Sequence, residues 1–75
     1  MENESKLTEF GKRVKYRLID LGKRQTWLER EITAKTGLFV DSGYMYKILT
    51  GQRVAPKIVK AISEVLDIPE DAVLI

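Results

Sequence analysis

The stretch from Asp41 to Arg53, DSGYMYKILTGQR, concentrates side chains that can bind another molecule through hydrogen bonds and charge. The residues Ser42, Tyr46 and Lys47 would share one face of a short helix, because they recur at helical spacing. The opposite face would be apolar and turned inward. Either this is an ordinary surface helix, or its outward face contacts a ligand.

Catalysis is a poor match to the residue types present. The chain contains no histidine and no cysteine, which removes the usual general base, thiol nucleophiles and thiolate metal sites. No pair of carboxylates is spaced within an evidently apolar pocket that would shift a pKa, and no phosphate-cradling glycine loop or metal-binding spacing is present. We expect no enzyme activity, no metal, no cofactor and no small-molecule substrate.

The net charge of +2 conceals an uneven distribution along the chain. Residues 1–10 carry −2 and residues 61–75 carry −4, whereas residues 11–60 contain twelve Lys/Arg against four Asp/Glu, which gives +8. A basic middle segment favours a polyanionic partner, because each neutralised phosphate releases condensed counterions.

The length of 75 residues predicts one domain, since a chain of this size buries only about 60% of its unfolded surface. No apolar run approaches the roughly 20 residues of a membrane span. We expect a cytoplasmic protein with no membrane contact, which would reach the nucleoid through DNA, and a disordered tail at residues 1–5.

Hydrophobic periodicity and helix-ending residues predict an all-α fold of five short helices. The predicted spans are 7–21, 25–36, 42–49, a helix that starts at Pro56 and ends by Asp67, and a last turn at 69–74. Gly22 and Gly37 would end the first two helices, and the Asp41 carboxylate would cap the third. The start of the second is weakly specified, because Arg24 is a poor cap residue. The predicted core consists of Val14, Leu18, Leu28, Ile32, Met45, Ile48, Leu49, Ile62 and Leu66.

Two successive short helices, the second polar on one side, are typical of a helix-turn-helix, here at about residues 25–50. In that motif the second helix lies in the DNA major groove and the first crosses the backbone. Small residues at its N-terminus would let the backbone approach base edges, and a lysine one turn later would reach a guanine or a phosphate. The predicted base-reading residues are Ser42, Gly43, Tyr46 and Lys47. The predicted phosphate-binding residues are Gln25, Tyr44, Thr50, Gln52, Arg53 and Lys57.

Structural roles compete with several of these assignments. Tyr44 lies one turn before Ile48, so it fits the edge of the core as well as a phosphate contact. Thr50 fits a helix stop and Arg53 a solvated side chain. Trp27 favours packing over binding, whereas Phe39 fits either the core or an interface with a partner.

The stretch from Gly11 to Leu74 resembles the phage-repressor and Cro family of helix-turn-helix regulators, often called XRE-type. The similar segments are GKRVKYRLIDLGKRQTWL, YMYKILTGQR and PKIVKAISEVLDIPEDAVL. The resemblance implies a compact lambda-repressor-like bundle. It implies that Gln25, Gln52, Arg53 and Lys57 hold the DNA backbone while the base-reading residues face the groove.

Two features depart from the family pattern. The chain between Leu28 and Gly51 is longer than is usual, with EREITAKTGLFVD as the extended part. Many members also pair an arginine in the first helix with a glutamate at the end of the recognition helix, where this chain has Leu18 and Leu49. Replacing both partners of a buried ion pair by apolar residues is often neutral or stabilising, so we predict that these two leucines touch.

The predicted function is a sequence-specific, double-stranded DNA-binding transcriptional regulator, a small phage-type or bacterial repressor. A lone domain reading about four or five base pairs discriminates poorly, since each mismatch costs only about 1–3 kcal/mol. A homodimer on a near-palindromic operator would remedy this, through DAVLI, through the Phe39 segment, or only on DNA. The alternatives are a protein-interaction module on the same fold, antirepressor or antitoxin-like, and a sequence-indifferent DNA binder.

Overall fold

A computed structural model describes residues 7–68 of the chain. Within them all regular structure is helical, as the sequence predicts. The helices are α2 (Glu9–Leu21), α3 (Gln25–Thr36), α4 (Ser42–Leu49) and α5 (Pro56–Leu66). The predicted tail at 1–5 and the predicted helical turn at 69–74 lie outside the described residues.

Local capping explains most of the helix boundaries. Gly22 and Gly37 follow α2 and α3 in the left-handed conformation, which glycine adopts without a steric penalty. The Asp41 carboxylate accepts the Tyr44 N–H at 2.8 Å and so begins α4. Pro56 stands in the first turn of α5, where its missing N–H costs nothing. The N-cap position of α3, Arg24, provides no side-chain hydrogen bond, in agreement with the sequence.

Helix α2 ends at Leu21 as predicted but differs from its prediction in its start and in the exposure of its last residue. It begins at Glu9 rather than at residue 7, because the Thr8 hydroxyl accepts the Gly11 N–H at 3.0 Å and caps the helix. Leu21, predicted as part of the buried stripe, is 41% exposed. It is the last residue before Gly22, where the chain turns away from the helix.

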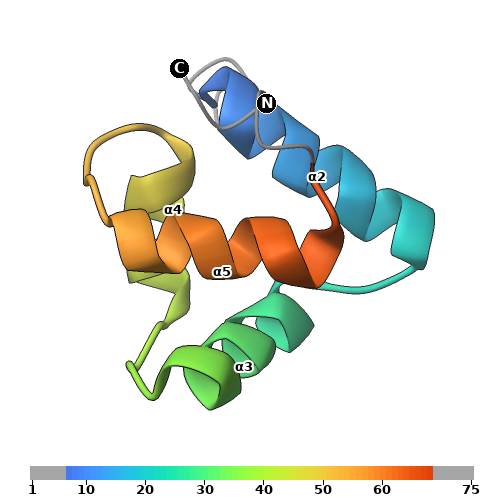
Figure 1. Cartoon of the computed structure of the whole chain (residues 1–75). Helices are drawn as coiled ribbons and strands as arrows, with labels where there is room; N and C mark the ends of the chain where they lie inside the picture. The colour runs from blue at the N-terminus through green and yellow to red at the C-terminus, as the bar shows by residue number, and fades with distance from the viewer. Residues whose placement is uncertain (1–6, 69–75) are drawn as a thin grey trace.

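The helices pack around one shared core (Figure 1). Helix α5 runs across the front of the view, with α3 below it and α4 behind its first turns. Helix α5 packs against α2 and α3, and α4 also packs against both. All nine residues predicted for the core are buried. The core also includes Phe10, Val40, Ile58, Ala61 and Ile68.

The segment 37–41 between α3 and α4 is held by side chains of α3. The Thr36 hydroxyl accepts the Leu38 N–H at 3.1 Å, and the Thr33 hydroxyl accepts the Val40 N–H at 3.2 Å. The Val40 side chain is buried in the core. These contacts fix the backbone that leads into α4.

The N-terminus of α2 is anchored on the C-terminus of α4. The Leu49 carbonyl oxygen accepts the Thr8 N–H and the Thr8 hydroxyl, each at 3.0 Å. This oxygen is one of the carbonyls that the end of a helix leaves without an intrahelical partner. Thr8 therefore caps α2 and completes the end of α4.

Replacing Thr8 with alanine is expected to lower the free energy of unfolding by about 1 kcal/mol, the usual cost of losing an N-cap side chain. Urea denaturation followed by circular dichroism would measure the loss. The control is Thr26→Ala, at an exposed position in the first turn of α3, which should change stability by less than about 0.5 kcal/mol. Equal losses in the two variants would contradict the capping role.

Leu18 and Leu49 are both buried in the core, 5% and 1% exposed. Both leucines are therefore shielded from water, as the replacement of an ion pair by two apolar side chains requires. Direct contact between the two side chains stays a prediction.

None of the helices within residues 7–68 combines the length and the apolar character that a membrane crossing requires.

Candidate nucleic-acid interface

Helix α4 separates an apolar side from a polar side. Met45, Ile48 and Leu49 are buried. On the other side, Ser42, Gly43 and Lys47 are exposed and Tyr46 is half-buried. We call these four outward residues the α4 face. They are the residues that the sequence predicts for base reading.

A chain of hydrogen bonds connects the beginning of α4 to α3 and α2. The Ser42 hydroxyl donates to the Glu29 carboxylate at 3.0 and 3.3 Å. The Gln25 side-chain amide donates to the same carboxylate at 2.9 Å. The Lys15 ammonium group donates to the Gln25 side-chain carbonyl at 3.0 Å. We call these four residues the carboxylate network.

Glu29 is the centre of the network and is 8% exposed. A buried carboxylate is costly unless it is hydrogen-bonded, and here Gln25 and Ser42 both donate to it. The beginning of α3 is thereby held beside the beginning of α4. Two residues that the sequence predicts for different roles, backbone binding and base reading, lie on one surface.

The other end of α4 is organised by local contacts. The Thr50 hydroxyl donates to the Tyr46 carbonyl at 2.8 Å, and the Gln52 side-chain amide donates to the Thr50 oxygen at 2.9 Å. The Arg53 guanidinium carbon lies 5.2 Å from the centre of the Tyr44 ring, within the range of a cation–π interaction. This stacking keeps the exposed Arg53 side chain close to α4.

The structure brings together most of the predicted DNA-contacting residues, but not all of them. Gln25 and Ser42 meet through Glu29, whereas Tyr44 meets Arg53. Tyr44 is also half-buried against the core, as expected for a residue at the edge of the core, and its phosphate contact stays a prediction. Lys57 is exposed in the first turn of α5. It makes no hydrogen bond or ion pair with the other predicted residues in the part of the chain that the structure describes.

Two residues of the network, Lys15 and Glu29, are missing from the sequence prediction. Gln25 and Glu29 are four residues apart, the spacing at which side chains meet on a helix surface, so this part of the network was open to prediction. The contact of Glu29 with Ser42 and that of Lys15 with Gln25 each join two helices. No local pattern signals them.

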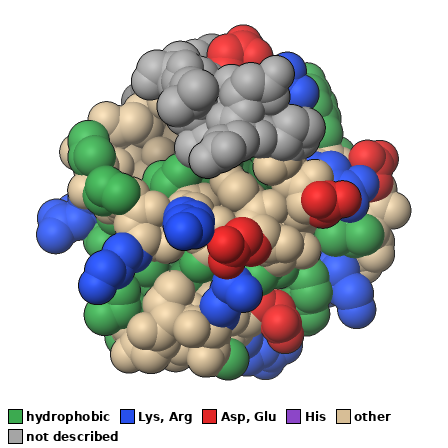
Figure 2. Space-filling model, viewed as in Figure 1, with side chains coloured by type: hydrophobic (Ala, Val, Ile, Leu, Met, Phe, Trp, Pro, Cys, Tyr) green, Lys and Arg blue, Asp and Glu red, His purple; other side chains and the backbone are tan. Residues whose placement is uncertain are grey.

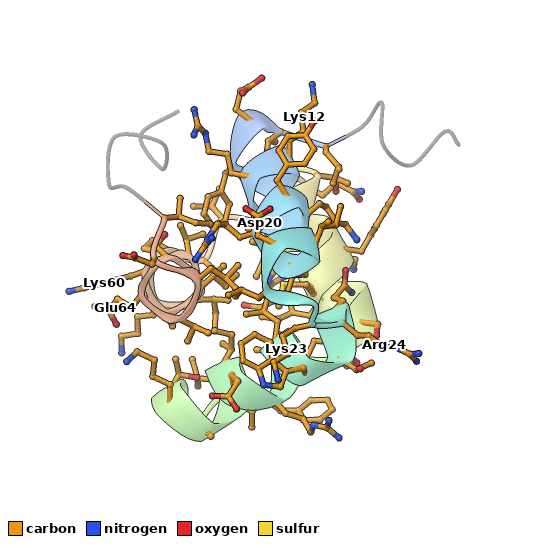
Figure 3. The ribbon with its side chains drawn as sticks, turned by 90° about the vertical axis from the view of Figure 1, so that its right-hand side faces the viewer. Lys12, Asp20, Lys23, Arg24, Lys60 and Glu64 are labelled. Atoms are coloured by element: carbon orange, nitrogen blue, oxygen red, sulfur yellow. The ribbon has the colours of Figure 1, made fainter. Side chains whose placement is uncertain are left out.

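Acidic and basic side chains are mixed on the face seen in Figure 2, where α5 runs across the front. Lys60 and Glu64 project from this helix, away from α4 (Figure 3). Between residues 7 and 68 the ion pairs are Arg17–Asp20 at 3.6 Å and Lys35–Glu64 at 3.4 Å. Both pairs are outside the α4 face and the carboxylate network. We call the surface around Lys60 and Glu64 the α5 face; the Glu64 carboxylate pairs with Lys35 there, which makes this surface less favourable for a polyanion.

The two aromatic residues of uncertain role differ in exposure. Trp27 is half-buried against the core, with the Lys23 ammonium 5.4 Å from its ring centre, so packing accounts for it. Phe39 is 80% exposed and the neighbouring Leu38 is 46% exposed. Phe39 is therefore not a core residue, and this short apolar segment just before α4 is free to contact another surface.

No protein-family model, curated protein or solved structure matches the chain. The likeness to the phage-repressor and Cro family therefore stays a prediction from the sequence.

Proposed function

We propose that the chain is a sequence-specific, double-stranded DNA-binding transcriptional regulator in which α3 and α4 form a helix-turn-helix. In this proposal the α4 face enters the major groove, and the beginning of α3 faces the backbone. The main support is the carboxylate network, which places Gln25 beside Ser42 through their shared acceptor Glu29. These hydrogen bonds fix the beginning of α4 against the beginning of α3, which supports joint contact of the two helices with one DNA surface.

Positive charge at the carboxylate network and near the end of α4 supports the proposal further. Lys15 uses one of its three ammonium hydrogens on Gln25, so two are left for a phosphate. Lys47 and Arg53 are exposed at the C-terminal end of α4. These three cations would contact phosphates or base edges on both sides of the groove, and Lys57 would add a further backbone contact.

The biological role would follow from occupancy of an operator. A near-palindromic site bound by two copies, with half-sites about 34 Å apart, would give the selectivity that a single short helix lacks. The proposal includes no catalytic step, cofactor or metal.

Binding to duplex DNA is expected to weaken about a hundredfold as monovalent salt rises from roughly 50 to 200 mM, the loss for about four neutralised phosphates. Fluorescence anisotropy on a duplex selected from a random pool would measure it, with an unselected duplex alongside. The control is Lys60→Ala on the α5 face, which removes one exposed cation and should leave the salt slope unchanged.

Three outcomes separate the candidate functions. A steep slope with tighter binding of the selected duplex supports the proposal. Equal affinity for selected and unselected duplexes would indicate a sequence-indifferent binder. A flat response would favour the second candidate, a protein-interaction module, which the exposed Phe39 and Leu38 support.

A further inference from the structure

The donors and acceptors of the carboxylate network can be assigned without ambiguity. An ammonium group has only hydrogens to give, so the Gln25 carbonyl faces Lys15 and the Gln25 amide faces Glu29. A carboxylate can only accept. The hydrogen between Ser42 and Glu29 must therefore be the single hydroxyl hydrogen of Ser42.

This assignment decides what Ser42 can offer to another molecule. Its only hydrogen points inward, toward a carboxylate that is 8% exposed and whose Oε2 atom also accepts from the Gln25 amide. The oxygen keeps an unused lone pair, because a hydroxyl combines one donor with two acceptor positions. Ser42 is exposed in the first turn of α4, so toward solvent it is an acceptor only.

We infer that Glu29 sets the base preference of Ser42, restricting it to the exocyclic amino group of adenine or cytosine. The inference rests on the proposed function. In the major groove adenine offers its N6 amino group and cytosine its N4 amino group, whereas guanine and thymine offer acceptors. An acceptor-only hydroxyl meets a donor on the first two bases and another acceptor on the other two.

Every base pair carries one amino group in the major groove, on one strand or the other. The predicted preference of Ser42 is therefore for the strand that carries the amino group. Ser42 would tolerate exchange of A·T for C·G, since both place an amino group on the contacted strand. It would reject the inverted pairs T·A and G·C, because these move the amino group to the opposite strand.

The experiment uses the full chain and four duplexes that differ at one position of a sequence selected from a random pool. The position is the one at which Ser42→Ala removes the preference. For the unchanged protein we expect A·T and C·G to bind within about twofold of each other. The inverted pairs should bind about tenfold more weakly, a typical effect for one mismatched base pair.

The decisive variant is Glu29→Met, which keeps a long side chain at the buried position but replaces the carboxylate with a thioether, only a weak acceptor for the Ser42 hydrogen. The freed hydroxyl can then donate as well as accept, so the inversion ratio should fall from about tenfold to about twofold or less, in keeping with loss of one base-specific hydrogen bond. The matched control is Glu31→Met, which removes the same charge from an exposed position of α3. It should raise affinity for all four duplexes and leave the ratio intact.

Ser42→Ala removes one of the two donors to Glu29 and leaves the Gln25 donor in place, so it tests the inference even if Glu29→Met does not fold in a circular dichroism melt. A position that prefers guanine or thymine, or no position that responds to Ser42→Ala, would overturn the inference while the proposed function stands. A tenfold ratio that survives in Glu29→Met would overturn it as well. Failure to enrich any duplex, together with a flat salt response, would overturn the proposed function and the inference with it.

Discussion

Replacing Gly11 with alanine is expected to lower the free energy of unfolding by about 2–3 kcal/mol, the cost of forcing an extra methyl group into a packed site. Gly11 is buried in the first turn of α2. A methyl group there would overlap the Leu49 carbonyl oxygen and lie 3.1 Å from the Leu7 Cδ2 atom. The oxygen cannot move away without losing its two hydrogen bonds to Thr8.

The expected loss is large for a domain of this size. At roughly 0.05–0.15 kcal/mol per residue, a domain of 75 residues has about 4–11 kcal/mol of stability in total. Urea denaturation of Gly11→Ala should therefore show a clearly lower midpoint. A folded variant should also have its α2–α4 contact disturbed, because Thr8 and Gly11 share the Leu49 oxygen as a neighbour.

The matched control is the same substitution at Gly43, in the first turn of α4. An added methyl group there would have the Asp41 Oδ1 atom as its nearest neighbour, at 3.7 Å, an ordinary contact. Gly43→Ala should therefore raise stability by about 0.5–1 kcal/mol, because alanine favours the helix more than glycine does. The same substitution should therefore lower the free energy of unfolding at Gly11 and raise it at Gly43. If Gly11→Ala were as stable as the unchanged protein, the close approach of α2 and α4 would be wrong.

The helices of this protein are predictable from local signals. Left-handed glycines, a capping aspartate and a proline in a first helical turn each act within a few residues. The end of α3 therefore follows from Gly37, and the starts of α4 and α5 follow from Asp41 and Pro56. The start of α2 was predicted too early, because Leu7 extends the apolar stripe while the hydrogen bonding of Thr8 begins the helix two residues later.

The arrangement of the candidate interface was less predictable, because it depends on contacts between helices. The sequence places Ser42 on the outward face of α4 but gives no information on the direction of its hydroxyl. That direction is set by Glu29, thirteen residues earlier, and by the path of segment 37–41. The burial of Val40 and the contacts of Thr33 and Thr36 determine that path. Side chains of segments far apart in the sequence must be placed before such a contact can be inferred.

Under the proposed function, Lys47→Ala and Arg53→Ala are expected to weaken DNA binding in different ways. Lys47 is exposed on the α4 face, one turn after Gly43, where it would reach a guanine edge. Its loss should reduce discrimination at one base pair by about tenfold, within the range for a base contact. Arg53 lies beyond the end of α4, stacked on Tyr44. Its loss should weaken all duplexes about equally and lower the salt slope by roughly one.

Arg53→Lys provides the control that separates charge from stacking. Lysine keeps the positive charge but lacks the planar guanidinium group that stacks on an aromatic ring. The salt slope should therefore stay near that of the unchanged protein, with a smaller, uniform loss of affinity from the freer side chain. Titrations of selected and mutated duplexes at several salt concentrations would measure both quantities. If Lys47→Ala and Arg53→Ala changed base preference and salt slope alike, α4 would not divide base reading from backbone contact, and the assignment of Lys47 to the groove would be wrong.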